Sequence, residues 1–376
     1  MKKRILYTVL LAAGLAFSSC SDQFLQDMNP YDSYSPEKTF GIESNLDLYI
    51  QNVYYNYFYK SGMTPPQSYG LSGNWNDYST YTEEKWGIEK KFDASRSLKK
   101  ATDCETYFGS NLATNIKNDP YSRIRSCNEI LEGVDKYGQG LSEAAIKKAK
   151  GQAYFFRAMQ LFDLVRMYGC VPIVTTVLNA EVTDAGLPRA SVTQCVEQIV
   201  KDLTDAAALL PDEWGTNDYG RLTRGGALAY KSRVLLFYAS PIFNKNWNDP
   251  GNLRWQKALE ATQNAISGIT ASGLDGVTDA ASWSKILADD DNEHSNRETL
   301  VVRLLAKESN SSLGYKNNRW EKNIRLSSQG GSGGKGAPIE LIDVFPMADG
   351  TLPDAAHQVT EGSLRFMENR DPRFYQ

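Results

Sequence analysis

Two clusters of aromatic and polar side chains are the residues of this chain best suited to bind a ligand. Each cluster lies in a polar stretch and combines tryptophan or tyrosine with amide, carboxylate or guanidinium groups. A flat aromatic ring packs against the apolar C–H face of a sugar, and planar polar groups pair with its hydroxyls. We therefore expect the clusters to contact carbohydrate, unless their tryptophans cover a helical core instead. The first cluster comprises Trp75, Asn76, Asp77, Tyr78 and Trp86, and the second comprises Tyr315, Asn318, Arg319 and Trp320.

No group of residues shows the spacing of a catalytic or metal site. The two histidines, His294 and His357, each stand alone in a polar stretch, so we expect exposed loop positions for them. The glycine cluster Gly330 to Gly336 lacks the residues of a phosphate-binding loop, and the acidic run Asp289 to Glu293 lacks the ligand pattern of an EF-hand. Nothing singles out a carboxylate pair for glycoside hydrolysis. The sequence predicts a protein that is not an enzyme and that holds neither a metal nor a cofactor.

Residues 1–20 have the pattern of a bacterial lipoprotein signal peptide. Basic residues at positions 2–4 precede an apolar run from Ile5 to Phe17, and Ser18, Ser19 and Cys20 follow. This run is too short for a transmembrane helix, which needs about 20 apolar residues. We expect cleavage before Cys20 and acylation of its side chain, so that the segment takes no part in the fold. The alternative is an ordinary signal peptide in which the cysteine is incidental.

Charge and cysteine usage narrow the class of protein further. The 376 residues carry a net charge of −4, which gives no general attraction to nucleic acid, whose binding proteins show basic patches. Export would allow one disulfide, but no Cys-x-x-Cys spacing occurs, and we expect mostly free, buried thiols. The cysteines in question are Cys104, Cys127, Cys170 and Cys195.

The hydrophobic pattern of the chain predicts a succession of helices. Apolar residues recur every three or four positions, as in Leu46, Ile50, Val53 and Tyr57, and such spacing marks one face of a helix. Successive helices of this kind form antiparallel pairs that stack as a repeat. The expected helices are about 41–60, 120–137 with 142–168, 191–210 with 222–240, and 254–271, and the stretches of about 62–117 and 282–376 are expected to be irregular.

Four residues within these helices have an expected structural role. Trp255 lies at helical spacing, which predicts a place in the core. Arg157, Arg166 and Arg233 are expected as buried partners of carboxylates or carbonyls, because a buried arginine is costly unless it is paired.

Two of the helices resemble the hallmark motifs of the SusD/RagB family. The first, Lys150 to Pro172, reads KGQAYFFRAMQLFDLVRMYGCVP, and the second, Arg221 to Leu236, reads RLTRGGALAYKSRVLL. The cysteine of the signal, the segment Pro338 to Gly350 (PIELIDVFPMADG) and Asp371 to Phe374 (DPRF) fall in the order that this family shows. The resemblance therefore runs from the signal to the last residues.

The resemblance implies a mostly α fold, a SusD-like α-superhelix. In it, tetratricopeptide-like helix pairs pack against an irregular, loop-rich part, within one domain of residues 21–376. It also implies a surface-exposed, lipid-anchored protein of the outer membrane that captures oligosaccharides and delivers them to a SusC-like TonB-dependent transporter. The alternatives are capture of peptides or other oligomers by the same lid, or a helical-repeat surface scaffold without a nutrient. Family members continue beyond the DPRF segment, so the resemblance further implies that a C-terminal portion is missing here.

Overall fold

A computed structural model describes six longer stretches of the chain, one pair of residues and two single positions. They are residues 35–58, 120–179, 186–271, 276, 279, 281–282, 298–302, 326–331 and 339–375. Helices dominate these stretches, and the only β-type pairing within them is an isolated bridge between Met347 and Arg370. The helices are α3 (Pro36–Gly41), α4 (Glu43–Phe58), α7 (Pro120–Tyr137), α8 (Glu143–Tyr168), α9 (Val192–Leu209), α10 (Arg224–Ala239), α11 (Arg254–Ala271) and α14 (Ile339–Val344).

The helices begin and end where the sequence provides the chemistry for it. Ser142 accepts a hydrogen bond from the amide of Ala145 at the start of α8, and Gly169 ends that helix with a φ of 70°, which favours glycine. At the start of α9, Ser191 and Gln194 form a reciprocal capping box. The expected helices therefore form nearly at their predicted limits, and the short α3, which precedes α4, is an addition that the sequence pattern did not predict.

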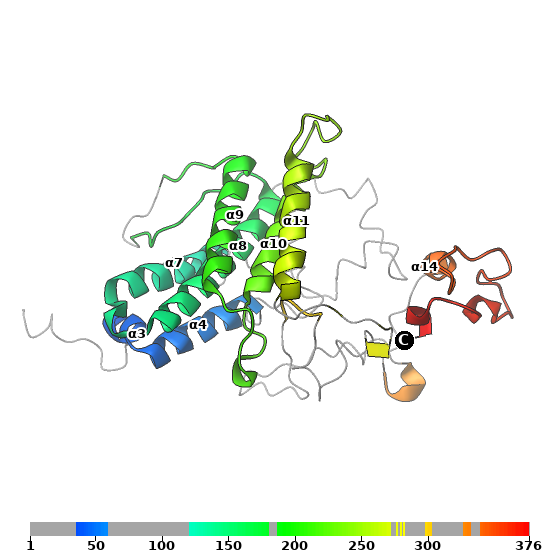
Figure 1. Ribbon diagram of the computed structural model, residues 1–376, viewed down its shortest axis with the longest axis horizontal. Helices are drawn as coiled ribbons and strands as arrows, with labels where there is room; N and C mark the ends of the chain where they lie inside the picture. Colours follow the sequence, from blue (N-terminus) through cyan, green and yellow to red (C-terminus); the bar gives the residue numbers. More distant parts are fainter. Residues whose placement is uncertain are drawn as a thin grey trace, which may run out of the picture.

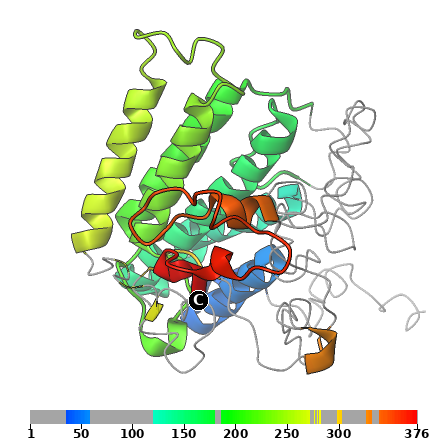
Figure 2. The ribbon, with the colours of Figure 1, turned by 90° about the vertical axis from the view of Figure 1, so that its right-hand side faces the viewer.

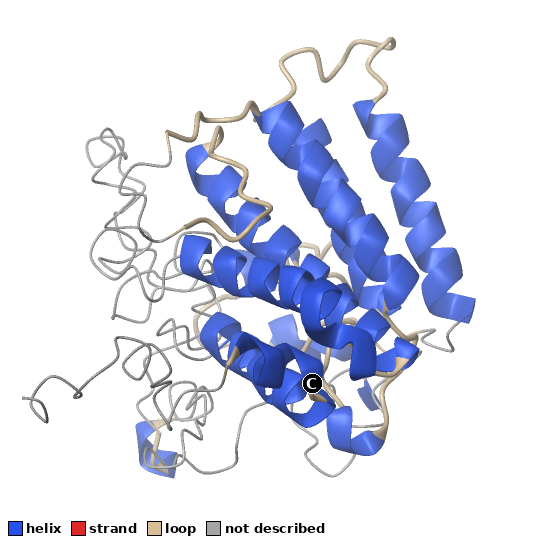
Figure 3. Ribbon diagram, turned by 90° about the vertical axis from the view of Figure 1, so that its left-hand side faces the viewer, coloured by secondary structure: helices blue, strands red, loops and turns tan. Residues whose placement is uncertain are grey.

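The described helices form a layered stack with α8 at its centre. α7 and α9 pack on α8, α10 packs on α9, and α11 packs on α10, while α3 and α4 pack on the side of α7 and α8. Figure 1 shows α8 to α11 as neighbouring rods, and Figure 3 shows the same helices from the side. The short connections 138–142 and 240–253 turn the chain back on itself. This arrangement confirms the predicted mostly α fold of stacked helix pairs.

The hydrophobic core is built around α8, which is buried on more than one side. Phe155, Phe156 and Phe162 are almost completely buried, and the ring of Tyr230 on α10 meets Phe155 and Phe162 edge to face. The predicted face of α4 is also buried in this core. A helix with apolar residues on several faces is stable only between neighbours, and this explains why α8 occupies the centre.

Two of the expectations about side chains within the helices are wrong. Trp255 is 38% exposed and not in the core, because the face of α11 that packs on α10 is formed by Ala258 and Ala265. Arg233 is exposed on the outer surface of α10. The other two arginines are paired as predicted, Arg157 with Asp202 and Arg166 with Asp163.

The last described stretch, 339–375, contains α14, short 3-10 helices and the bridge between Met347 and Arg370. This composition agrees with the expectation of an irregular part. Figure 1 shows this stretch to one side of the helical stack and apart from α8 to α11, and Figure 2 shows it in front of the stack. The buried Arg370 holds it together by donating to the backbone oxygens of Phe345, His357 and Phe366. Among the described helices, none is both long and apolar enough to cross a membrane.

Candidate functional site

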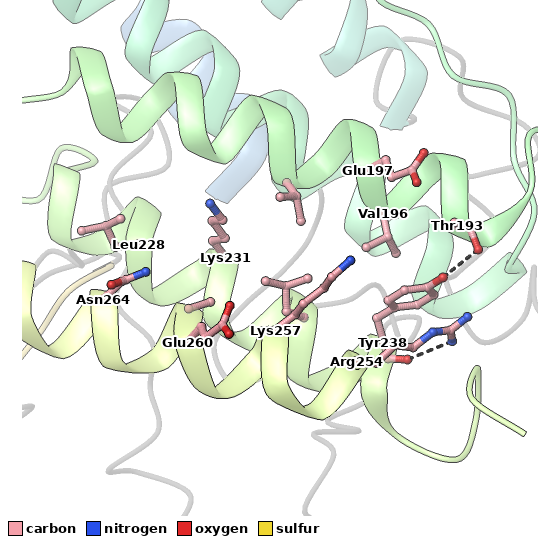
Figure 4. A pocket seen from close by; sticks show the side chains of 13 residues that line it. Thr193, Val196, Glu197, Leu228, Lys231, Tyr238, Arg254, Lys257, Glu260 and Asn264 are labelled. Atoms are coloured by element: carbon pink, nitrogen blue, oxygen red, sulfur yellow. Dashed lines mark hydrogen bonds between the residues drawn. The ribbon is translucent and has the colours of Figure 1, made fainter. Parts of the chain in front are cut away.

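A surface groove lies where α9, α10 and α11 meet, with a volume of about 450 Å³ (Figure 4). Each helix contributes residues three or four positions apart, and such residues share one helix face. The groove therefore exists because one face of each of the three helices meets the others. Its lining residues are Thr193, Val196, Glu197 and Val200 from α9, Leu228, Lys231, Leu235 and Tyr238 from α10, and Arg254, Lys257, Glu260, Ala261 and Asn264 from α11.

Aliphatic side chains and charged side chains share the surface of the groove. Its apolar part comes from valines of α9, leucines of α10 and Ala261 of α11. The polar part comes from long side chains, whose stems can cover apolar surface while the charges reach solvent. A ligand that fits here would offer both apolar groups and charged or hydrogen-bonding groups.

One end of the groove is fixed by contacts of Tyr238. Its hydroxyl lies 2.6 Å from the hydroxyl of Thr193, and the guanidinium of Arg254 lies 3.8 Å from the centre of its ring. Arg254 also donates to the backbone oxygen of Phe243 at 2.7 Å. This end of the groove is therefore rigid, and one face of the only aromatic ring in the lining is covered by the arginine.

The charges in the groove are not neutralised by one another. Lys231 donates to the hydroxyl of Thr204 at 2.9 Å, and Glu260 accepts from Gln256 at 2.8 Å. Within the described residues, no carboxylate pairs with Lys231, Arg254 or Lys257. These three cations could bind a carboxylate or another anionic group of a ligand.

A second hollow of about 450 Å³ lies between α3 and α7. Its acidic groups already serve the fold, because Glu129 accepts from the hydroxyl of Tyr49 at 2.5 Å and Glu132 accepts from the amide of Val177 at 2.7 Å. Burial, with the help of Glu129, raises the pKa of Tyr49 well above its ordinary value. This hollow therefore offers fewer free polar groups than the groove at α9 to α11.

All residues that are predicted from the sequence to contact a ligand lie outside the described residues. The first cluster falls in the segment that leaves α4 at Phe58 and returns at Pro120, and the second falls between positions 302 and 326. Cys20, the expected lipidation site, also lies outside. The roles of these residues stay predictions: Trp75, Asn76, Asp77, Tyr78, Trp86, Tyr315, Asn318, Arg319, Trp320 and Cys20.

The groove at α9 to α11 was missed by the sequence analysis. Its residues have ordinary helical spacing, and the only signal is that charged residues interrupt the apolar positions of α10 and α11. That signal does not reveal which faces of three helices meet, because their packing decides it.

The cysteines and the histidine within the described stretches have structural surroundings. Cys127 and Cys195 are buried free thiols, as expected, whereas Cys170 is free and exposed. Burial raises the pKa of the Cys127 thiol to about 12, which keeps it protonated and unreactive. His357, expected to be exposed, is half-buried, and its Nδ1 lies 2.7 Å from a carboxylate oxygen of Asp354.

Comparison with known proteins shows one consistent similarity. Residues 23–236 match the SusD-like family described as "Starch-binding associating with outer membrane". A curated "SusD-like protein" of Bacteroides ovatus is 26% identical over 306 residues, which are 80% of this chain and 50% of that protein. This chain thus spans about half the length of the curated relative.

Solved structures share the fold. A SusD-like protein of Bacteroides fragilis superposes with a TM-score of 0.64 at 22% identity, over 92% of this chain and 62% of the other. A SusD-like carbohydrate-binding protein of the same species has a TM-score of 0.58 at 18% identity, over 90% of this chain and 59% of the other. At these identities, the two structures support the fold of the helical stack.

Proposed function

The chain belongs to the SusD-like family, and on this premise we propose that it captures oligosaccharides at the outer membrane and passes them to a SusC-like TonB-dependent transporter. Capture proceeds by stacking and hydrogen bonding, without cleavage of a glycosidic bond. Acylated Cys20 would attach the protein to the membrane at the cell surface. The observation that carries the proposal is the family match over residues 23–236, whose description joins starch binding to the outer membrane.

The binding chemistry of the proposal rests on the two predicted clusters. Trp75 and Trp320 would stack on the apolar faces of sugar rings, while Asp77, Asn318 and Arg319 would bond to hydroxyls. The first cluster belongs to the segment between α4 and α7, two helices that pack on each other and on α8. The helical core would thus hold both ends of this segment in fixed positions.

A second candidate function is the capture of peptides, and the groove between α9, α10 and α11 favours it. An aliphatic surface beside Lys231, Lys257 and Glu197 suits a chain with apolar and charged side chains better than it suits a sugar ring. The groove also has a single aromatic ring in its lining, Tyr238, and Arg254 covers one face of it. The groove would serve this function without any contribution from the predicted sugar-binding clusters.

Native gels cast with a panel of polysaccharides test the proposed function. The chain from Ser21 onward should be retarded by at least one polysaccharide, and Trp75→Ala or Trp320→Ala should reduce the retardation. Tyr55→Ala, at an exposed aromatic position on α4, is the matched control and should behave as the wild type. If no glycan retards a sample that has the helical circular dichroism of the folded protein, capture of polysaccharide is contradicted. That result would favour peptides as the ligand.

Three further experiments test attachment to the membrane, association with a transporter and the expected lack of glycan cleavage. Metabolic labelling with palmitate should label the full-length protein and not the Cys20→Ser variant. The wild-type protein, solubilised from the outer membrane, should co-purify with a β-barrel transporter. Incubation with the retarding glycan should yield no shorter products, and their appearance would mean that the protein is an enzyme.

A further inference from the structure

The connection between α10 and α11 contains a four-residue sequence that also occurs at the first predicted cluster, where it includes Trp75, Asn76 and Asp77. Residues 246–249 read Asn-Trp-Asn-Asp, as do residues 74–77. The copy at 246–249 lies within the described residues. It occupies the end of the helical hairpin, next to the first turn of α11.

Backbone hydrogen bonds give this connection a fixed shape. The amide of Trp247 donates to the oxygen of Asn244 at 3.0 Å, and the amide of Asp249 donates to the oxygen of Asn246 at 3.0 Å. The side chain of Asp249 accepts from the amide of Gly251 at 2.8 Å. Residues 246–249 therefore lie in consecutive turns at the tip of the α10–α11 hairpin, and they belong to neither helix.

Buried polar side chains hold the base of the connection. Asn244 is buried and donates from its amide to the oxygen of Ala239 at 2.9 Å, and the side chain of Asn252 donates to Asn244. Arg254 donates to the oxygen of Phe243 at 2.7 Å and stacks on Tyr238. The tip is therefore organised before any ligand arrives, which lowers the entropy cost of binding.

Two tryptophans are exposed on this organised tip. Trp247 is 47% exposed and Trp255 is 38% exposed, and the indole nitrogen of Trp255 donates to the backbone oxygen of Trp247 at 2.8 Å. That bond joins the two residues across the end of the hairpin. Within the described residues, the side-chain amides of Asn246 and Asn248 have no hydrogen-bond partner, so both are available to a ligand.

We infer that the tip of the α10–α11 hairpin is a second carbohydrate-contact site, in which Trp247 and Trp255 stack on sugar rings. Asn246 and Asn248 would bond to the hydroxyls, because an amide both donates and accepts. The inference rests on the proposed function and adds to it a site away from the two predicted clusters. Two sites on one protein would bind a long polysaccharide more tightly than a short oligosaccharide, because the second contact becomes intramolecular.

An apolar docking surface for another protein is the competing interpretation. Ile242, which is 72% exposed, and Leu253 lie in the same connection and would strengthen such a surface. What favours carbohydrate is the position of Trp247 between the side-chain amides of Asn246 and Asn248, in a four-residue sequence that also occurs at 74–77. The two interpretations differ in which substitutions they tolerate.

The test uses the polysaccharide that retards the wild-type chain in the native gel. Trp247→Ala should weaken its affinity about 3- to 10-fold, while Trp247→Phe, which keeps an aromatic face, should retain most of it. Ile242→Ala is the matched control, since it removes exposed apolar surface from the same connection and leaves the rings. The loss should be larger for the polymer than for a fragment of a few sugar units. Thermal unfolding of each variant shows whether the fold is intact.

The outcomes separate this inference from the proposed function. If the polysaccharide binds and Trp247→Ala binds it as the wild type does, the second site is wrong and the proposed function stands. A further variant, Trp247→Leu, keeps apolar surface but removes the ring. If Trp247→Leu retains the affinity, or if Ile242→Ala loses as much as Trp247→Ala, the tip is an apolar docking surface and the inference is also wrong. If no glycan binds, both fail together.

Discussion

Arg157 on α8 donates to both carboxylate oxygens of Asp202 on α9, from Nε at 2.8 Å and from Nη2 at 2.7 Å. Both side chains are buried, and Nη1 of the same arginine donates to the side-chain oxygen of Asn128 on α7 at 2.8 Å. Burial raises the pKa of the Asp202 carboxyl, and the arginine opposes this shift. One guanidinium thus joins three successive helices of the stack.

The first prediction is that Arg157→Met destabilises the protein by about 3–5 kcal/mol, because it leaves the carboxylate of Asp202 buried without its counter-ion. The double variant Arg157→Met/Asp202→Leu should recover much of this loss, since it leaves no buried charge. Urea unfolding followed by circular dichroism measures both. Arg233→Met, at the exposed arginine of α10, is the control and should change stability little. A double variant as unstable as the single one would contradict the argument.

The second prediction concerns the contact of α3 with α7. A Cβ added at Gly133 would lie 2.4 Å from two atoms of the Phe40 ring, so the ring would have to leave its place. We expect Gly133→Ala to destabilise the protein by about 1–3 kcal/mol. Gly215→Ala is the matched control, because no atom lies within 4 Å of its added Cβ. Urea unfolding of the two variants gives the comparison.

A double-mutant cycle locates the cause of that effect. In the background of Phe40→Ala, the same Gly133→Ala substitution should cost little, because the ring that it meets is gone. An equal cost in both backgrounds would show that the loss arises elsewhere in α7.

The third prediction is a pH dependence that comes from Asp47 on α4. Arg221, in the connection between α9 and α10, donates to both of its oxygens at 2.6 and 2.9 Å. Burial opposes ionisation of this carboxyl, but the bonds from Arg221 and Gln51 prevail and hold its pKa below the ordinary value of 3.8. The folded protein therefore binds this proton less readily than the unfolded chain. The stability from the pair is present above pH 3.8 and is lost as the pH falls through the folded pKa.

Asp47→Asn should accordingly lower the free energy of unfolding by about 1 kcal/mol or less at pH 7, since the carboxylate is partly exposed to solvent. The difference from the wild type should shrink between pH 4 and pH 2. Unfolding in urea at pH 7 and in this acidic range measures it. A difference that stays constant with pH would mean that the charge of Asp47 is not what matters.

The helices of the core could be predicted because their signals are local. Ser191 with Gln194 starts α9, Gly169 ends α8, and the apolar spacing of α4 identifies its buried face. Such signals depend on neighbours in the chain and not on the packing of distant segments. The same local reasoning explains why the predicted limits of these helices are close to the observed ones.

Packing decides what the sequence could not reveal. Helical spacing predicts that Trp255 lies in the core. Small residues of α11 pack on α10 instead, and the indole of Trp255 is exposed. Spacing shows that a face exists and does not say which partner covers it. Packing also creates the groove, because the contact of three helices brings its residues together. In the same way, the turn between α10 and α11 brings Trp247 next to Trp255.

The fourth prediction is that Arg254 positions the tip of the α10–α11 hairpin. Its guanidinium donates to the backbone oxygens of Phe243 and Tyr238, at 2.7 and 3.4 Å. Its backbone amide donates to the side-chain oxygen of Asn252 at 3.1 Å. Arg254→Met removes the guanidinium bonds and keeps a stem of similar length. We expect a loss of about 1.5–3 kcal/mol from the stability of the connection, because bonds from a charged donor are involved.

Hydrogen–deuterium exchange over residues 240–253 measures that loss locally, and exchange should become faster there in Arg254→Met while the core of α8 stays unchanged. The affinity for the retarding polysaccharide should also fall, because Trp247 and Trp255 no longer hold fixed positions relative to each other. In this proposal the arginine itself makes no contact with the sugar. Arg254→Lys, which can restore one bond to Phe243, should lie between the wild type and Arg254→Met in both measurements. Faster exchange with unchanged affinity would mean that the order of the tip does not contribute to carbohydrate binding.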